Sequence, residues 1–332
     1  MNLGKLSEPI LKRSVFKQIK NNNDVLVKGA DIGMDCALFD VDGTYIATAT
    51  ASLSCEKGDD VIARCIYRAT NNLLAGKTSP FAVQLHVMLP ERMREIALKR
   101  MMEAAEKAAE KIGVTISGGH TEVMEEIQRP IISVTALGKG SNLIESKLHP
   151  GQEIVMSKWI AISATAVLAK EREEALLTRY PAYFVKSAQS LEQYYSINSE
   201  AKVAWNENVF AMHDVAGGGI YGALWELGER YQVGLEVQLK KIPIKQETVE
   251  VCEFFELNPY ELRSDGALLM VTDNGEQLVN KLAQEGISSQ VIGRITADND
   301  KVIVNDDERR FLEPPRKEQV IAQLLKNHKE NN

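Results

Sequence analysis

Two successive runs of short strands and helices, divided near Pro150-Gly151, constrain the fold of this chain more than any other feature. Apolar alternation predicts strands, and an apolar period of 3.6 residues predicts helices. The first half predicts strands at 25–27, 37–41, 45–49, 81–89 and 131–137, with helices at 60–75 and 93–112. The second half predicts strands at 154–156, 209–213, 235–237, 267–271 and 290–295, with helices at 164–179, 188–195, 220–231, 246–255 and 275–285. This order indicates an α+β architecture with an N-terminal domain at 1–150, a C-terminal domain at 151–325 and a polar tail at 326–332.

The composition is that of a soluble globular protein. The 332 residues suffice for two domains, with 44% hydrophobic and 26% charged residues. A net charge of -7 argues against nucleic-acid binding, which needs clustered Lys and Arg. The four cysteines form no CxxC pair, and no apolar run resembles a membrane span or a secretory signal. We therefore expect a cytoplasmic protein with reduced thiols and with neither nucleic acid nor membrane as a partner.

Three consecutive glycines, Gly217 to Gly219, join the predicted strand at 209–213 to the predicted helix at 220–231. Glycines at a helix N-terminus expose backbone N–H groups at the positive end of the helix and let an anion such as phosphate approach. Asp214 stands beside them, where a carboxylate is suited to a metal ion or a ribose hydroxyl. A tight turn without a ligand is the competing interpretation, because glycine-rich turns are common between strands and helices.

A second glycine segment, Gly118-Gly119-His120-Thr121-Glu122, follows the predicted helix at 93–112, and we expect it to form a loop. Its Glu122 is a candidate metal ligand. His120 has two interpretations, a polar residue in a turn or a donor that faces phosphate, since neutral and protonated imidazole can both donate to an oxygen.

Several motifs occur together in the order that a known superfamily carries. They are Gly4-Lys5-Leu6, Gly33-Met34-Asp35-Cys36-Ala37, Asn71-Asn72-Leu73, the two glycine segments, Gly151 to Lys158, Ile242-Pro243-Ile244 and Ser264 to Leu269. In this order the chain resembles the aminoimidazole ribonucleotide (AIR) synthetases, selenophosphate synthetases, thiamine-phosphate kinases and HypE-type hydrogenase maturation factors. The resemblance is greatest to the HypE type.

The resemblance implies a PurM-like two-domain fold. In that fold an N-terminal AIR synthase-like domain pairs with its copy in a second subunit to form a β-barrel, and a C-terminal α/β domain follows. It implies a homodimer that binds ATP and Mg²⁺ beside the barrel and transfers a phosphoryl group to a carbonyl or amide oxygen. It also implies a link to hydrogenase maturation, with another maturation protein as a partner and a small-molecule substrate that the sequence does not identify.

Carried over to this chain, the resemblance implies two sets of site residues and leaves the catalytic residues unidentified. The metal ligands are Asp35, Asn72, Glu122 and Asp214. The nucleotide or phosphate contacts are Gly118, Gly119, His120, Thr121, Lys158, Asp214, Gly217, Gly218 and Gly219. Asp35 also fits a turn aspartate, and Lys158 also fits a surface lysine at a strand end.

The chain departs from the family pattern where the family carries aspartates. Residues 47–52 hold no carboxylate, position 34 is Met, position 72 is Asn and position 120 is His. We therefore expect a weakened magnesium site, because methionine and alanine offer no oxygen ligand. HypE-type carbamoyl dehydratases end in a cysteine that accepts the carbamoyl group, whereas this chain ends in Asn332, and Cys252 lies in a helical pattern that indicates burial.

Three functions remain open at this point. The retained glycines and Asp214 favour an active ATP-dependent enzyme. The missing aspartates favour a catalytically impaired paralogue that acts as a binding or scaffolding protein. A small-molecule kinase similar to thiamine-phosphate kinase is the third alternative.

Overall fold

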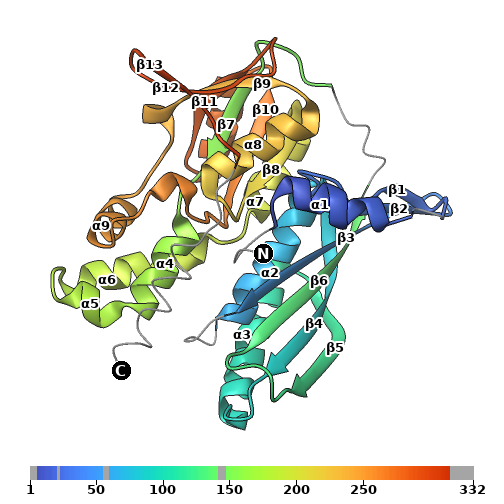
Figure 1. Cartoon of the computed structure of the whole chain (residues 1–332), viewed down its shortest axis with the longest axis vertical. Coiled ribbons are helices and arrows are strands. Elements are labelled where there is room, and N and C mark those ends of the chain that lie inside the picture. Colours follow the sequence, from blue (N-terminus) through green and yellow to red (C-terminus); the bar gives the residue numbers. More distant parts are fainter. Residues whose placement is uncertain (1–5, 21–22, 55–59, 141–146, 315–332) are drawn as a thin grey trace. The chain divides into compact units, whose positions relative to one another are not determined.

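The computed structural model describes residues 6–20, 23–54, 60–140 and 147–314, and it divides the chain into two compact units (Figure 1). The N-terminal unit comprises the described residues 23–30, 35–54 and 60–140, and the C-terminal unit comprises 6–20, 31–34 and 147–314. Each unit combines a sheet with helices, which confirms the α+β prediction. Cys55 and the predicted tail at 326–332 lie outside the described residues. No described helix is long and apolar enough to span a membrane.

The N-terminal unit is a six-stranded sheet with two helices on one face (Figure 1). The strand order is β1-β2-β3-β6-β4-β5, and only β4 and β5 run parallel. The elements are β1 Leu26–Lys28, β2 Ala37–Val41, β3 Thr44–Ser54, α2 Val61–Ala75, β4 Thr78–Leu89, α3 Glu95–Ile112, β5 Thr115–Val123 and β6 Ile131–Gly140.

Alternation along the central strands gives this sheet one apolar and one polar face. The inward residues of β3, β4 and β6 are buried together with apolar residues of α2 and α3 in one core. On the opposite face, Thr50 meets Thr135 with 3.0 Å between their Oγ1 atoms, and Ser52 meets Ser133 with 2.7 Å between their Oγ atoms. Both pairs are exposed, so we call this side the open face.

The C-terminal unit is built around a seven-stranded sheet of order β13-β12-β9-β11-β7-β10-β8. Every residue of β10, which lies between β7 and the edge strand β8, is buried, as expected for a strand covered on both faces. The strands are β7 Glu153–Ser157, β8 Val209–Val215, β9 Gly234–Gln238, β10 Ala267–Thr272, β11 Ser289–Thr296, β12 Lys301–Asn305 and β13 Glu308–Phe311. The helices are α1 Glu8–Ser14, α4 Ile162–Glu171, α5 Glu173–Leu177, α6 Ala182–Gln189, α7 Asn198–Asn206, α8 Gly219–Tyr231, α9 Gln246–Phe254 and α10 Gly275–Gln284, with short 3₁₀ turns η1 Phe16–Gln18, η2 Ser190–Tyr194, η3 Leu239–Lys241 and η4 Pro259–Glu261.

Part of the N-terminal sequence groups with the C-terminal unit, whereas we expected residues 1–150 to form one domain. Residues 31–34 pack on α8. Arg230 donates from Nη1 to the carbonyl of Gly33 at 3.3 Å, and a Cβ on Gly33 would lie 2.8 Å from the carbonyl oxygen of Glu226. These contacts join residues distant in sequence, so local patterns do not indicate them.

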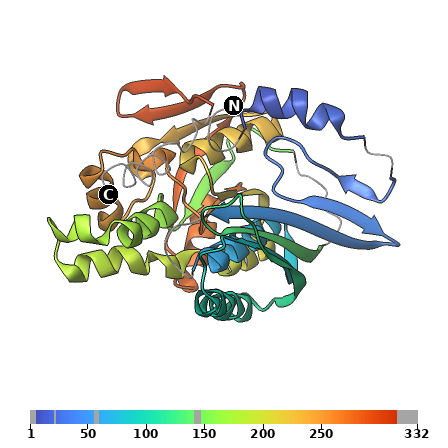
Figure 2. The same ribbon diagram turned by 60° about the horizontal axis from the view of Figure 1, so that its bottom comes forward.

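Most predicted elements occur close to their expected positions, and the differences are local. The helix expected at 164–179 is divided into α4 and α5 at Arg172, whose φ is -121°. The helix expected at 188–195 is the end of α6 followed by η2. The hairpin of β12 and β13, which Figure 2 shows at the upper edge, was not predicted. Strand β12 has only five residues with a continuous apolar centre and β13 has four mostly polar residues, so neither gives a clear alternating pattern.

Candidate functional site

The strand, turn and helix predicted around Asp214 are confirmed. Strand β8 carries Asp214 next to its last residue, opposite Leu268 of β10, and the carboxylate is mostly buried. The turn then passes Gly218 in the left-handed region at φ 88°, and α8 begins at Gly219, also left-handed at φ 64°. No side chain among the described residues caps this 13-residue helix. Its first N–H groups therefore fit an anion, as the sequence suggested.

Gly219 also has a packing reason that involves no ligand. A Cβ at this position would lie 2.5 Å from the carbonyl oxygen of Tyr260 and 2.7 Å from that of Leu262. The 3₁₀ turn η4 is held there in part by Tyr260, whose ring stacks on that of Tyr221 with 5.4 Å between centroids. At this one glycine, close approach of another backbone is sufficient to explain the residue type.

We predict that Gly219→Ala destabilises the protein by about 2–4 kcal/mol, because the new methyl group meets two carbonyl groups in a left-handed conformation. The matched control is Gly113→Ala, which has φ 84° and open space around its Cβ and should cost only about 1 kcal/mol. Urea unfolding of the two variants measures the difference. Equal free energies of unfolding for the two variants would show that the backbone of η4 does not exclude a methyl group at position 219.

Lys158 is buried, which corrects the surface interpretation. Its Nζ donates to the carbonyl oxygens of Tyr194 at 3.0 Å, Ser196 at 2.6 Å and Gly266 at 2.8 Å, and it lies 2.5 Å from Glu200 Oε1. Only 8% of the residue is exposed. The ammonium can meet a phosphate only by leaving a buried carboxylate, so its contacts give it a structural role in the C-terminal unit.

Replacing Lys158 with Met should cost about 3–5 kcal/mol, since it leaves the buried Glu200 without its cation. Lys170→Met removes a pair with Glu192 that is much more exposed, and should cost about 0–1 kcal/mol. Thermal and urea unfolding compare the two. A stable Lys158 variant that has lost nucleotide affinity would instead favour the phosphate interpretation.

The segment Gly118 to Glu122 is part of β5, so the prediction of a loop is wrong here. The physical reason lies in the parallel pairing with β4. Gly119 has φ 146°, and a Cβ on it would lie only 1.7 Å from the carbonyl oxygen of Leu85. Thr121 is paired with the buried Val87, so alternation turns it away from the open face.

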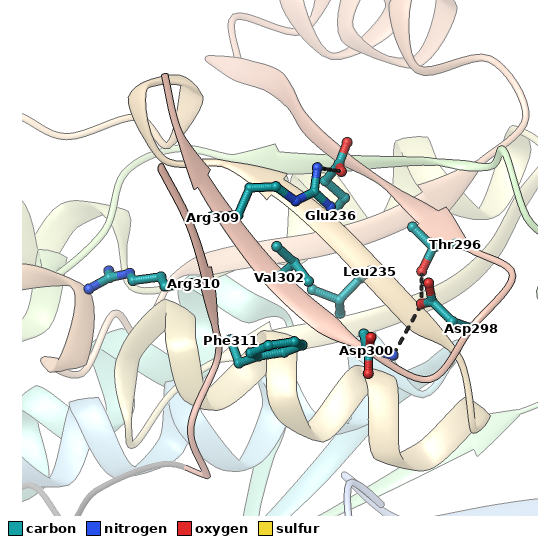
Figure 3. Close-up of a pocket in the computed structure, with 9 residues that line it drawn as sticks. All are labelled: Leu235, Glu236, Thr296, Asp298, Asp300, Val302, Arg309, Arg310 and Phe311. Carbon is teal, nitrogen blue, oxygen red and sulfur yellow. Dashed lines mark hydrogen bonds and ion pairs between the residues drawn. The ribbon is translucent and has the colours of Figure 1, made fainter. Parts of the chain in front are cut away.

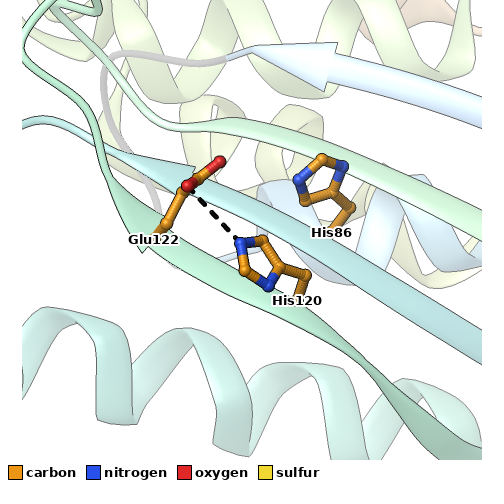
Figure 4. Close-up of side chains that lie close together, drawn as sticks. All are labelled: His86, His120 and Glu122. Atoms are coloured by element: carbon orange, nitrogen blue, oxygen red, sulfur yellow. Dashed lines mark ion pairs between the residues drawn. The ribbon is translucent and has the colours of Figure 1, made fainter.

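The pairing of β4 and β5 brings His120 and Glu122 together with His86, a residue that the sequence analysis did not single out. His120 Nε2 lies 3.4 Å from Glu122 Oε2, and the rings of His86 and His120 have centroids 5.5 Å apart (Figure 4). All three side chains are exposed. The sequence analysis missed His86 because no local pattern links it to His120, and the two residues meet only through the register of β4 and β5.

The N-terminal unit holds two other predicted ligands. Asp35 lies just before β2, and Asn72 lies in the last turns of α2. Asn72 is partly buried and its carbonyl accepts the N–H of Gly76 at 3.1 Å. Ala51, within the stretch where the family carries an aspartate, faces the core and is 6% exposed. A carboxylate at Ala51 would therefore be buried in this chain.

The C-terminal unit also buries His213 and Cys252. His213, beside Asp214, is buried with its Nε2 3.3 Å from Glu226 Oε2 of α8, an arrangement that the sequence did not suggest. Burial raises the pKa of the Cys252 thiol to about 12. The buried position of Cys252 is as predicted, and a thiol with this pKa is a poor nucleophile at neutral pH.

A pocket of about 230 Å³ lies at the β9–β12–β13 end of the C-terminal sheet (Figure 3). Glu236 on its wall is paired with Arg309 at 2.8 Å, and Asp298 accepts from Thr296 Oγ1 at 2.7 Å. The carboxylates of Glu236 and Asp298 thus have partners, and the lining of the pocket includes no predicted site residue. We therefore do not assign this pocket to nucleotide or metal binding.

Comparison with protein families matches both units. The AIR synthase related protein N-terminal domain matches residues 33–139, and the AIR synthase related protein C-terminal domain matches residues 149–305. One relative, named for hydrogenase expression and formation in Methanocaldococcus jannaschii, is 23% identical over 91% of this chain and 91% of its own length. Carbamoyl dehydratase HypE of Rhizobium leguminosarum bv. viciae is 23% identical over 73% of this chain and 70% of its own length.

Solved structures share the fold at low sequence identity. HypE in complex with ATP has a TM-score of 0.71 and 19% identity, covering 90% of this chain and 92% of its own. HypE in the HypE–HypF complex has a TM-score of 0.72 and 20% identity, covering 86% and 94%. ThiL complexed with AMPPCP and TMP has a TM-score of 0.67 and 18% identity, covering 85% and 92%.

Proposed function

The chain belongs to the AIR synthase related family, and we propose that it binds ATP with Mg²⁺ and transfers a phosphoryl group to a carbonyl or amide oxygen of a small substrate. The observation that carries this proposal is the fold shared with HypE in complex with ATP over 90% of the chain. The relative named for hydrogenase expression and formation supports a role linked to hydrogenase maturation.

The proposed ligand types fit magnesium and phosphate. Asp35 and Asp214 offer carboxylate oxygens and Asn72 an amide oxygen, which are the donors that Mg²⁺ prefers. Glu122 also offers a carboxylate, but β3, β6 and β4 separate its strand β5 from β2, which Asp35 precedes. Asp35 and Glu122 of one chain therefore do not bind the same ion. The uncapped start of α8 fits phosphate oxygens. When bound, the metal neutralises charge on the phosphates.

In this proposal the protein acts mainly by positioning. The acceptor oxygen attacks the γ-phosphorus, the bond to ADP breaks, and ADP leaves with the electron pair. The N–H groups at the start of α8 would bind phosphate oxygens, and the neighbouring Asp214 would offer a carboxylate oxygen to the metal, so that the nucleotide is aligned for attack. The kinase alternative shares this step and differs only in the acceptor, so ATP binding is tested first.

We also propose a homodimer that pairs through the N-terminal units. The open face of the six-stranded sheet supports this, because Thr50, Ser52 and their cross-strand partners leave it without a cover of its own helices. The polar character of the face suits hydrogen bonding between copies. Measurement of the oligomeric mass in solution tests it, and a monomer at micromolar concentration would oppose it.

A non-catalytic binding protein is the second candidate, and particular residues favour it. Gly119 and Gly219 have packing reasons, Lys158 is held by Glu200, and Ala51 faces the core. A partner maturation protein is the proposed ligand in that case, as HypE is found in complex with HypF.

Isothermal titration with ATP, with and without magnesium, tests the proposed activity. We expect magnesium-dependent binding in the micromolar range, about -8 kcal/mol. Asp35→Asn should weaken it about tenfold or more, because a metal-binding charge is lost. Asp40→Asn is the matched control, since Asp40 accepts the N–H of Gly43 in a hairpin and asparagine can do the same. Absence of binding at millimolar ATP would leave the binding-protein candidate.

Restoring a carboxylate by Asn72→Asp should tighten nucleotide binding in the presence of magnesium only. Asn72 is suited to this change because it is partly exposed, whereas Ala51 is in the core. The same titration without magnesium is the control, and there the added charge should repel the phosphates. An affinity unchanged by the substitution would place residue 72 away from the metal.

A further inference from the structure

Strand register places two histidines and a glutamate on one side of the N-terminal sheet. In the parallel pair of β4 and β5, His86 is opposite His120, and Glu122 lies two residues farther along β5. Residues two apart share a face, so His120 and Glu122 project together. His86 is also opposite Ser133 of β6, whose hydroxyl meets Ser52 on the open face. The three side chains therefore stand at the β5 end of the open face.

The distances between their donor atoms fit a metal ion. One donor atom from each of the three side chains can be chosen so that all lie within 4.8 Å of one another. A tetrahedral zinc ion with bonds of about 2.0–2.1 Å holds its ligand atoms about 3.3 Å apart. His120 Nε2 and Glu122 Oε2 are 3.4 Å apart, and Figure 4 shows the ring of His86 on the same side. A nitrogen of His86 lies within 4.8 Å of a ligand atom of each of the other two residues.

The backbone beneath the cluster is fixed. Gly119 lies so close to Leu85 that no side chain fits between the strands, and β4 is paired on its other edge with β6. The positions of His86 and His120 relative to each other are thus set by the sheet rather than by a loop. A site built on rigid strands loses little entropy when a metal binds.

We propose that His86, His120 and Glu122 bind a divalent transition-metal ion of the zinc class. Two imidazoles and one carboxylate favour Zn²⁺, Co²⁺ or Ni²⁺, whereas Mg²⁺ prefers oxygen donors alone. In the single chain all three side chains are exposed. The fourth position is therefore open to water or to a group of the second copy that the proposed homodimer brings to this face. This site does not rest on nucleotide binding, although it shares Glu122 with the proposed magnesium ligands.

An ion pair between protonated His120 and Glu122 is the competing explanation of their contact. An exposed pair of this kind contributes about 0–1 kcal/mol and has no need of His86. Dependence of metal binding on His86 therefore distinguishes a metal site from an ion pair.

The test is a titration of tag-free, chelator-stripped full-length protein with Zn²⁺ in the absence of nucleotide, at a concentration where the oligomeric mass is known. We expect one ion per chain. His86→Ala, His120→Ala and Glu122→Gln should each weaken binding about tenfold or more, since even loss of an outer partner of a metal ligand costs 10–100-fold. Co²⁺ as a probe should show visible absorption bands that are lost in the same variants.

Two control variants make the result specific. His149→Ala removes a histidine of the C-terminal unit that contacts Phe210, and it should leave Zn²⁺ affinity unchanged. Asp35→Asn should weaken magnesium–ATP binding but not Zn²⁺ binding, which separates the two proposals. The zinc site is overturned if His86→Ala or His120→Ala binds Zn²⁺ as the unaltered protein does, or if millimolar Zn²⁺ does not bind.

Discussion

Burial of one face of the six-stranded sheet under α2 and α3 determines what the N-terminal unit can offer to a ligand. The inward residues of β3, β4 and β6 are committed to the core, so every second residue of these strands is left to the open face. The same alternation that buries Ala51 exposes Ser52, and the same alternation that buries Val87 exposes His86. Polar chemistry on this unit is therefore confined to alternate positions, and register decides which of them meet.

Sequence reasoning was sufficient where the signal is local. The strand at 209–213, the glycine turn and the helix at 220–231 follow from periodicity and turn chemistry, and the structure has β8 and α8 there. It failed at Gly118-Gly119, because paired glycines are typical of loops. The reason for Gly119 is the close approach of β4, on which its partner Leu85 lies 34 residues earlier in the chain. Local patterns also did not indicate the position of His86 beside His120 or the burial of Lys158, since both depend on residues distant in sequence.

The glycines show why residue type alone does not identify a phosphate site. Gly219 begins an uncapped helix, which fits an anion, and it also allows η4 to pack, which needs no anion. These two explanations are compatible, because a backbone that is held by packing is already arranged to donate its N–H groups. Stability and nucleotide affinity of variants at Gly219 must therefore be separated before either role is assigned.

Glu122 connects the two proposals for metal binding through the chemistry of its neighbours. In a set of oxygen donors it suits magnesium, whereas His86 and His120 give it the nitrogen-rich surroundings that borderline metals prefer. His120 contributes an imidazole to β5 at a point where a carboxylate would have added a negative charge. This residue type makes the strand less suited to magnesium and more suited to zinc. Glu122 has one histidine on its own strand and one on the neighbouring strand. The metal that Glu122 binds is therefore determined by the other ligands, and two imidazoles favour zinc over magnesium.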